Sequence, residues 1–179
     1  RVGPRFFSFF GNRLVELVGL YNGASVLDVG CGRGAILFPA AEKVGAFGKV
    51  IGIDLAETML QLTTIDIENQ GIENAQVCNM DAEALRFPDA SFDFAIYGFA
   101  LYEFYDLAPA LSEAFRVLKS NGVFASSLWG RNIDTRWDSF RNVVKSYRGQ
   151  LKPVPEGGNL PRLREPADIE AVLSKAGFA

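Results

Sequence analysis

The sequence predicts a three-layer α/β domain built around a mostly parallel sheet. From residue 12 onward, short apolar runs alternate with stretches of helical periodicity, which is typical of successive strand–helix units. Five of the apolar runs are short enough to be strands, and we find no internal repeat. The chain has 179 residues, of which 49% are hydrophobic. This is enough for one buried core, so we expect a single domain over residues 1–179.

The expected elements follow one another with short connections. We predict strands at residues 25–29, 49–54, 76–78, 92–97 and 123–128. We predict helices at residues 12–21, from the glycine loop to about 45, at about 57–70, at 107–118 and at about 166–175. Asn12 is a candidate N-cap for the first helix, and Gly71 is expected to close the third. Asn121 and Gly122 predict a turn before the fifth strand.

Two segments do not fit the strand–helix pattern. Residues 1–11 are rich in phenylalanine and contain too many apolar groups for a free tail. We expect the phenylalanine side chains either to cover a ligand or to form an interface. They are Phe6, Phe7, Phe9 and Phe10. Residues from about 130 to 165 are interpreted as an insertion with an amphipathic helix and a Pro- and Gly-rich loop. Between residues 131 and 164 there are 8 basic and 3 acidic residues. This excess is either a solvated helix face or a region that attracts an anionic substrate.

Composition argues against several classes of protein. The longest uncharged apolar stretch, residues 94–102, is far shorter than the ~20 residues that span a bilayer, so we expect no integral membrane contact. The N-terminus does not resemble a signal peptide. With 2 cysteines and no histidine, we expect no metal site and a reducing, cytoplasmic location. The net charge of -3, with no basic stripe outside the insertion, argues against nucleic acid as a partner.

A glycine-rich loop directly follows the first predicted strand. The run VLDVGCGRG, residues 26–34, places three glycines between an apolar strand and a helix. Glycine permits positive φ and close backbone approach, and it leaves amide groups free to bind an acidic or zwitterionic ligand. On its own, such a match is equally compatible with a tight turn that binds nothing.

Two acidic residues follow the next two strands. Asp54 ends the second strand, 20 residues after Gly34, where a carboxylate can bind both hydroxyls of an adenosine ribose. Its alternative role is to cap the following helix. Asp81, which lies between Met80 and Ala82, could contact an adenine ring, or it is a solvated loop carboxylate.

Parallel topology would bring these residues to one edge of the sheet. Ligands of such sheets bind outside the carboxyl ends of the strands. Gly30, Asp54, Asp81 and Tyr97 all fall at those ends in successive units. We therefore expect them to share one crevice.

The motifs VLDVGCGRG, VIGIDLAETML, NMDAEALRFPDASFDFAIYGFAL and RVLKSNGVF together give a specific likeness. The chain resembles class I S-adenosylmethionine-dependent methyltransferases, in particular the type 11 and quinone-type small-molecule group. The resemblance covers residues 22–128 and returns at the final EPADIEAVLSKAGF. It implies a Rossmann-like fold with a sixth and a reversed seventh strand after the last helix. Neither strand is present in this sequence, so we expect the chain to be a fragment.

The resemblance also implies a cofactor, S-adenosyl-L-methionine, and a set of contacts to it. The loop containing Gly30, Cys31, Gly32 and Gly34 would approach the methionine part. Asp28 would order that loop or meet the cofactor's amino group, and Asp54 would hold the ribose. The remaining implied contacts are to adenine from Leu55, Met80, Asp81 and Ala82, and to the methionine end from the backbone of Tyr97.

The expected reaction is in-line methyl transfer to an oxygen or carbon nucleophile of a small molecule. The strand-four motif reads Tyr97-Gly98-Phe99-Ala100 and lacks the Asn/Asp-Pro-Pro-Tyr/Phe of enzymes that methylate amino groups on nucleobases or glutamine. Since fixing the nucleophile supplies much of the rate, no base is obligatory. In the absence of histidine, the candidates for a base are Tyr102, Glu103, Tyr105 and Asp106. The alternative, which the local pattern favours, is aromatic packing at a helix start for the two tyrosines and a favourable charge at the helix N-terminus for the two acids.

Two other functions stay open from the sequence. Gly30, Gly32 and Ala35 also satisfy the GxGxxA pattern of NAD(P)-binding oxidoreductases, although no tyrosine is followed by lysine four residues later. A non-catalytic S-adenosylmethionine-binding module is the other alternative. The oligomeric state and the identity of the methyl acceptor are not encoded in any recognisable pattern.

Overall fold

The protein is described from a computed structural model that covers residues 3–104, 106–128 and 166–178. Its sheet contains β1 (Ser25–Val29), β2 (Lys49–Asp54), β3 (Ala75–Asn79), β4 (Phe92–Gly98) and β5 (Leu118–Ser127). The strand order is β3-β2-β1-β4-β5, and every neighbouring pair is parallel. The chain winds outward from β1 to β3 and then crosses over to β4, so the order reverses between β1 and β4. Open parallel sheets bind ligands at this point.

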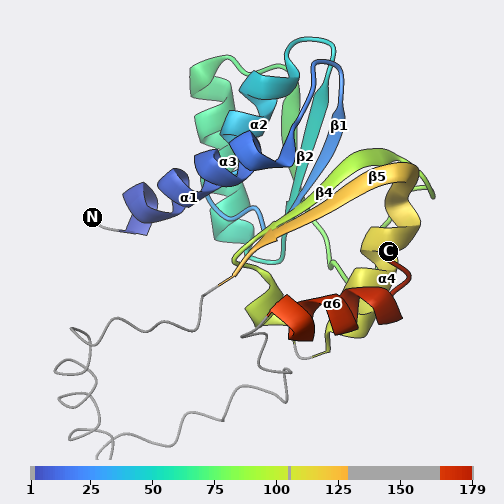
Figure 1. The fold of residues 1–179 in the computed structure, drawn as a ribbon. Helices are drawn as coiled ribbons and strands as arrows, with labels where there is room; N and C mark the ends of the chain where they lie inside the picture. The colour runs from blue at the N-terminus through green and yellow to red at the C-terminus, as the bar shows by residue number, and fades with distance from the viewer. Residues whose placement is uncertain (1–2, 105, 129–165, 179) are drawn as a thin grey trace, which may run out of the picture.

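Helices cover both faces of the sheet (Figure 1). One face carries α1 (Gly3–Val18), α2 (Leu37–Val44) and α3 (Glu57–Gln70), and the other carries α4 (Leu107–Val117) and α6 (Pro166–Lys175). A short 3-10 helix, η1 (Leu101–Glu103), follows β4. The predicted Rossmann-like, three-layer architecture is confirmed for the described residues, among which no helix is long and apolar enough to cross a membrane.

Each central strand divides its side chains between two cores. In β1, Val26 packs toward α1, α2 and α3, whereas Leu27 and Val29 pack toward α4. Both sets are almost fully buried. Strands covered on both faces have near-continuous apolar sequences, which is why residues 25–29 and 49–54 were predictable with the bounds that the structure gives to β1 and β2.

The third helix also matches its prediction. It spans Glu57–Gln70 and ends at Gly71, whose φ of 63° and ψ of 34° are left-handed. The Gly71 amide donates to the carbonyl oxygens of Ile67 and Glu68, so a residue without a Cβ closes the helix as expected. The last helix matches residues 166–175, while β3 and β4 are slightly longer than predicted, and α4 ends one residue earlier, at Val117.

The first helix was predicted wrongly. It begins at Gly3 and ends at Val18, so Asn12 lies inside it and does not cap it. The Asn12 Nδ2 instead donates to the Ser8 carbonyl, 2.7 Å away and one turn earlier. The phenylalanine-rich segment is therefore helical, because its rings gain tertiary contacts that a local reading cannot include.

The expected turn at Asn121 and Gly122 was also wrong. Residues 118–127 form one strand, in which Leu118 pairs with Phe92 and Val123 pairs with Phe94. The extra residues form an irregularity in the ladder, as in a β-bulge. The predicted insertion at about 130–165 and its amphipathic helix lie outside the described residues.

Candidate cofactor site

The three glycines of the loop after β1 all have positive φ: 69° at Gly30, 47° at Gly32 and 74° at Gly34. A Cβ at Gly30 would lie 2.8 Å from the Ala100 Cβ, and a Cβ at Gly34 would lie 2.5 Å from the Phe38 ring. A larger residue at either position would clash with its neighbour and would also be strained by the positive φ. At Gly32 a Cβ would meet no atom within 4 Å, so the loop is open there and a ligand can approach its backbone.

Backbone and side-chain groups at the end of β2 hold the loop. The amides of Gly30 and Cys31 donate to the Ile53 carbonyl oxygen at 2.9 and 3.0 Å. The Gly32 amide donates to Asp54 Oδ2 at 2.8 Å. The Asp54 carboxylate, predicted to bind ribose, thus lies directly against the glycine loop.

The second carboxylate oxygen of Asp54 also has a backbone partner. Asp54 Oδ1 accepts from the Ala56 amide at 2.8 Å, which forms an Asx turn. The N-cap of α3 is Ala56, so Asp54 is not the cap residue that the alternative reading required. Because a carboxylate oxygen has two lone pairs, each oxygen keeps capacity for a ligand hydroxyl.

Asp28 is the most unusual titratable group of the site. Its side chain is 1% exposed, and Oδ2 has no hydrogen-bond partner among the described residues. Burial raises its pKa to about 7, the Leu37 amide opposes this shift, and the nearby Asp54 charge adds to it. A buried carboxylate with a free oxygen is unfavourable unless a cation or donor reaches it, so Asp28 is suited to an ammonium group.

Asp28 lines a small cavity between the glycine loop, the ends of β4 and β5, and α1. The cavity measures about 20 Å³, close to the room needed for a single water molecule. Its lining is Phe7, Gly11, Asp28, Gly30, Cys31, Ala35, Ile36, Gly98, Phe99 and Ser127. This space is too small for the methionine part of a cofactor.

The N-terminal helix closes this cavity through aromatic contacts. The rings of Phe6, Phe7 and Phe10 lie with centroids 5.6 to 6.1 Å from that of Phe99. Phe99 has a φ of 57°, rare for a non-glycine residue, and its amide donates to the Ser127 carbonyl and hydroxyl oxygens. Among the described residues, Phe9 has a ring contact only with Phe10, and it is 67% exposed, so both roles expected for the phenylalanines stay predictions.

The predicted adenine contacts gather at the ends of β2 and β3. Asn79 Nδ2 donates to the carbonyl oxygens of Asp54 and Leu55 at 3.2 and 3.1 Å. The Leu55 side chain is 66% exposed, whereas Met80 is buried. Asp81 Oδ1 accepts from the Glu83 amide at 2.9 Å in an exposed loop, and Ala82 beside it is buried. The parallel sheet thus brings these residues to one edge, as expected, and their contacts to adenine stay predictions.

Tyr97 is placed differently from its neighbours. Its side chain is fully buried on the α4 side, where the hydroxyl donates to the Ala110 carbonyl at 3.3 Å. Its carbonyl oxygen accepts from the Ser126 hydroxyl at 3.0 Å. Gly98 and Phe99, the next two residues, line the cavity instead.

The candidates for a base lie between the end of β4 and the start of α4. Tyr102 and Glu103 belong to η1, and Tyr105 lies outside the described residues. Asp106 is the N-cap of α4, with Oδ1 accepting from the Ala108 amide at 3.0 Å. This contact agrees with the structural role considered for Asp106 from the sequence.

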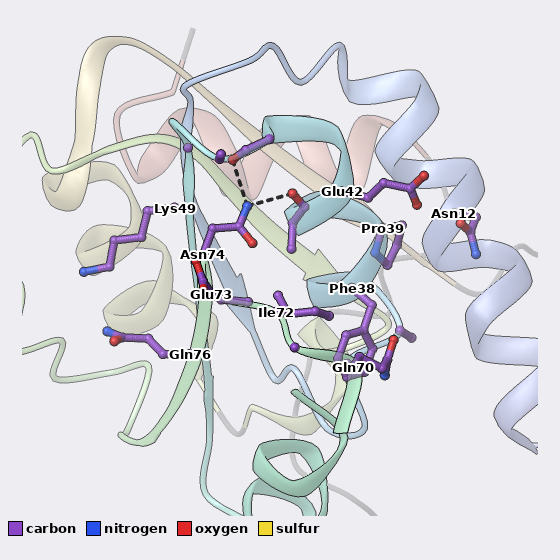
Figure 2. Close-up of a pocket in the computed structure, with 18 of the residues that line it drawn as sticks. Asn12, Phe38, Pro39, Glu42, Lys49, Gln70, Ile72, Glu73, Asn74 and Gln76 are labelled. Carbon is purple, nitrogen blue, oxygen red and sulfur yellow. Dashed lines mark hydrogen bonds between the residues drawn. The ribbon is translucent and has the colours of Figure 1, made fainter. Parts of the chain in front are cut away.

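A larger groove lies along the outside of α2, away from the acidic residues of the site. It has a volume of about 940 Å³ and runs from Arg33 to the amino-terminal ends of β2 and β3. Figure 2 shows Asn74 in this groove, where its amide donates to the carbonyl oxygens of Ala41 and Gly45, both at 2.8 Å. The groove contains neither Asp28 nor Asp54, so it is separate from the crevice expected at the carboxyl ends of the strands.

Comparison with known proteins agrees with this geometry. The sequence profile of a methyltransferase domain family matches residues 20–165. Aklanonic acid methyltransferase DauC of a Streptomyces species is 41% identical over 125 residues, which are 70% of this chain and 57% of that protein. Nocamycin O-methyltransferase of Saccharothrix syringae is 40% identical over 120 residues, which are 67% of this chain and 43% of that protein. The chain thus spans about half the length of these relatives.

Solved structures show the same fold. A SAM dependent methyltransferase from Aquifex aeolicus superimposes with a TM-score of 0.73 and 25% identity, covering 93% of this chain and 78% of its own. The YcgJ protein of Bacillus subtilis gives a TM-score of 0.71 and 25% identity, and the match covers 96% of this chain and 69% of that protein.

A parallel sheet with a glycine loop and carboxylates at its strand ends is typical of α/β domains that bind a nucleoside-type cofactor. The chain belongs to the methyltransferase domain family, within the S-adenosylmethionine-dependent class, so the resemblance noted from the sequence is confirmed.

Proposed function

We propose that the whole protein transfers a methyl group from S-adenosylmethionine to an oxygen or carbon nucleophile of a small molecule. The observation that carries this proposal is that two carboxylates lie beside the glycine loop, which is open at Gly32. Asp28 is buried with one oxygen lacking a hydrogen-bond partner among the described residues, and Asp54 accepts a hydrogen bond from the Gly32 amide. The site would accept a ligand that is cationic at one end and carries a diol in its middle. S-adenosylmethionine has both features.

Different residues of the site would bind different parts of the cofactor. Asp28 would bind the ammonium group, and Asp54 would accept hydrogen bonds from the two ribose hydroxyls. Leu55 and Met80 would pack on adenine, beside Asp81 and Ala82. When bound, the cofactor supplies an electrophilic methyl group, and α1 would exclude water from it, which strengthens electrostatic interactions in the site.

The acceptor is proposed to be a small, planar and largely apolar molecule. The wall formed by Phe6, Phe7, Phe10 and Phe99 supports this, since aromatic rings favour other rings at such distances. The names of the relatives, which include a demethylmenaquinone methyltransferase of Lactococcus lactis, also indicate small-molecule acceptors. The basic excess of residues 131–164 supports an anionic group on the acceptor. Two free thiols, Cys31 and Cys78, support a reducing, cytoplasmic location.

Calorimetry with S-adenosylhomocysteine and, separately, NADH tests the cofactor assignment. We expect the wild-type chain to bind S-adenosylhomocysteine and not NADH. Asp54→Ala should weaken binding roughly 10- to 100-fold, because charge-assisted hydrogen bonds contribute about 1.5–3 kcal/mol. Asp89→Ala is the control, since Asp89 is exposed and pairs with Arg116 on the α4 side. Binding of NADH alone would overturn the proposal in favour of an oxidoreductase.

Catalysis needs its own measurement, because a fold alone does not define a reaction. Transfer of labelled methyl from S-adenosylmethionine to a panel of phenols and quinols separates an enzyme from a non-catalytic binding module. S-adenosylhomocysteine binding without transfer to any acceptor would favour the module.

A further inference from the structure

A hydroxyl group of α3 forms a hydrogen bond with the backbone of the glycine loop. Thr63 is fully buried in the middle of the helix. Its Oγ1 donates to the Gly32 carbonyl oxygen at 2.8 Å, 31 residues away in the sequence. The adjacent Thr64 instead donates to the Leu60 carbonyl of its own helix at 2.9 Å, which is the common behaviour of a helical threonine.

This hydrogen bond acts on the least constrained glycine of the loop. A Cβ at Gly30 or Gly34 would meet Ala100 or Phe38, but nothing lies within 4 Å of the Cβ position of Gly32. Glycine without packing contacts loses much conformational freedom when it is ordered. Hydrogen bonds therefore supply the order: Asp54 holds the Gly32 amide, and Thr63 holds its carbonyl.

The direction of one peptide group follows from this contact. The peptide between Gly32 and Arg33 is trans, so its N–H points away from the carbonyl that Thr63 holds. The Arg33 guanidinium in turn pairs with Asp66, one turn after Thr63 on the same helix. Thus α3 holds the Arg33 side chain outside the loop while it sets the direction of the Arg33 amide.

We propose that Thr63 is a positioning residue for the cofactor: its hydroxyl fixes the Gly32–Arg33 peptide in the orientation that binds the methionine part. This inference rests on the cofactor site proposed above. A loop that is ordered only part of the time binds more weakly in proportion to that fraction. Removing the hydroxyl should therefore weaken cofactor binding without removing any atom that touches the cofactor.

The test compares Thr63→Val, Thr63→Ser and Thr64→Val by calorimetry with S-adenosylhomocysteine. Thr63→Val keeps the side-chain shape and should weaken binding on the order of 10-fold, within the range expected for one hydrogen bond. Thr63→Ser restores the hydroxyl and should bind within about threefold of wild type, and Thr64→Val within about twofold. Amide hydrogen exchange at Gly32, whose N–H donates to Asp54 Oδ2, should accelerate in Thr63→Val alone when it is measured without ligand.

Four outcomes are informative. Wild-type affinity in folded Thr63→Val, with Asp54→Ala still impaired, overturns the positioning role and leaves the proposed function intact. Equal losses in Thr63→Val and Thr64→Val also overturn it, because the effect would then be general destabilisation of α3. If Thr63→Val does not fold, Thr63→Ala against Thr63→Ser replaces it, and equal affinities of that pair overturn the role. Failure of the wild type to bind S-adenosylhomocysteine overturns the proposed function and this inference with it.

Discussion

Replacing Asp28 by Asn isolates the effect of burying a carboxylate that has one oxygen without a partner. In the unfolded chain this carboxyl has an ordinary pKa of 3.8, whereas in the folded protein burial raises its pKa to about 7. Between these pH values the folded state holds one more proton than the unfolded state. Stability contributed by this group is therefore fully present below pH 3.8 and is lost as pH rises toward 7, at about 1.4 kcal/mol per pH unit.

The expected magnitude follows from this slope. From pH 5 to pH 8 the wild type should lose about 3 kcal/mol through Asp28, and Asp28→Asn should lose none of it. Denaturant unfolding of both proteins at half-unit steps of pH measures the difference, in which the other acidic groups largely cancel. The new amide adds an offset that does not vary with pH. Stability curves that run parallel from pH 5 to pH 8 would refute the reasoning.

The same group gives a signal when the cofactor binds. An ammonium group beside Asp28 would stabilise the charged carboxylate and lower its pKa. At pH 6 the binding of S-adenosylhomocysteine should then release nearly one proton, since the carboxyl is mostly protonated beforehand. Calorimetry in two buffers of different ionisation enthalpy counts the protons. The count should be close to zero for Asp28→Asn, and a wild-type count of zero would contradict contact between Asp28 and the ammonium group.

Two further predictions concern glycines that serve different purposes. Gly32→Ala should remain folded and lose about 1–2 kcal/mol of unfolding free energy because of its φ of 47°, yet it should lose S-adenosylhomocysteine binding. Gly34→Ala should lose more unfolding free energy, because its Cβ would lie 2.5 Å from the Phe38 ring at a φ of 74°. Denaturant unfolding with calorimetry checks both, and equal stabilities would contradict the packing argument. Gly11→Ala should loosen α1 and cost about 1–3 kcal/mol, since a Cβ would lie 2.0 Å from the Ala35 carbonyl oxygen. Limited proteolysis of α1 against Leu17→Ala, which alters a side chain 67% exposed on the same helix, tests this, and equal cleavage rates would contradict it.

The fold was predictable where local pattern and tertiary structure agree. Residues 25–29 and 49–54 are apolar because they are buried on both faces, and parallel pairing then brings Gly30 and Asp54 to the same edge. The helix ending at Gly71 was predictable because its closing residue is a local requirement. In these cases the sequence pattern and the long-range structure have the same physical cause.

The remainder depends on contacts between residues distant in sequence. Nothing around residue 6 indicates that its ring meets Phe99, and nothing near Phe99 indicates a left-handed backbone at a bulky residue. The start of α1 and the closed cavity over Asp28 both follow from that pairing. Likewise, a threonine in mid-helix carries no local sign that its partner is 31 residues away. Asn79 had a weak sign, since it ends a strand at the predicted edge, but which carbonyls it holds depends on how β2 and β3 pair.

The hydrogen bonds to Gly32 and the burial of Asp28 have opposite effects on the stability of the protein without a cofactor. Hydrogen bonds from Asp54 and Thr63 order Gly32 before any ligand arrives, which lowers the entropy that binding must remove. Burial of Asp28 beneath α1 disfavours its charged form, and a cationic ligand would relieve that cost. A cofactor would then enter by displacing α1 from the Asp28 cavity while the loop keeps its shape. Hydrogen exchange in the presence of S-adenosylhomocysteine should accordingly change most in α1 and least at Gly32.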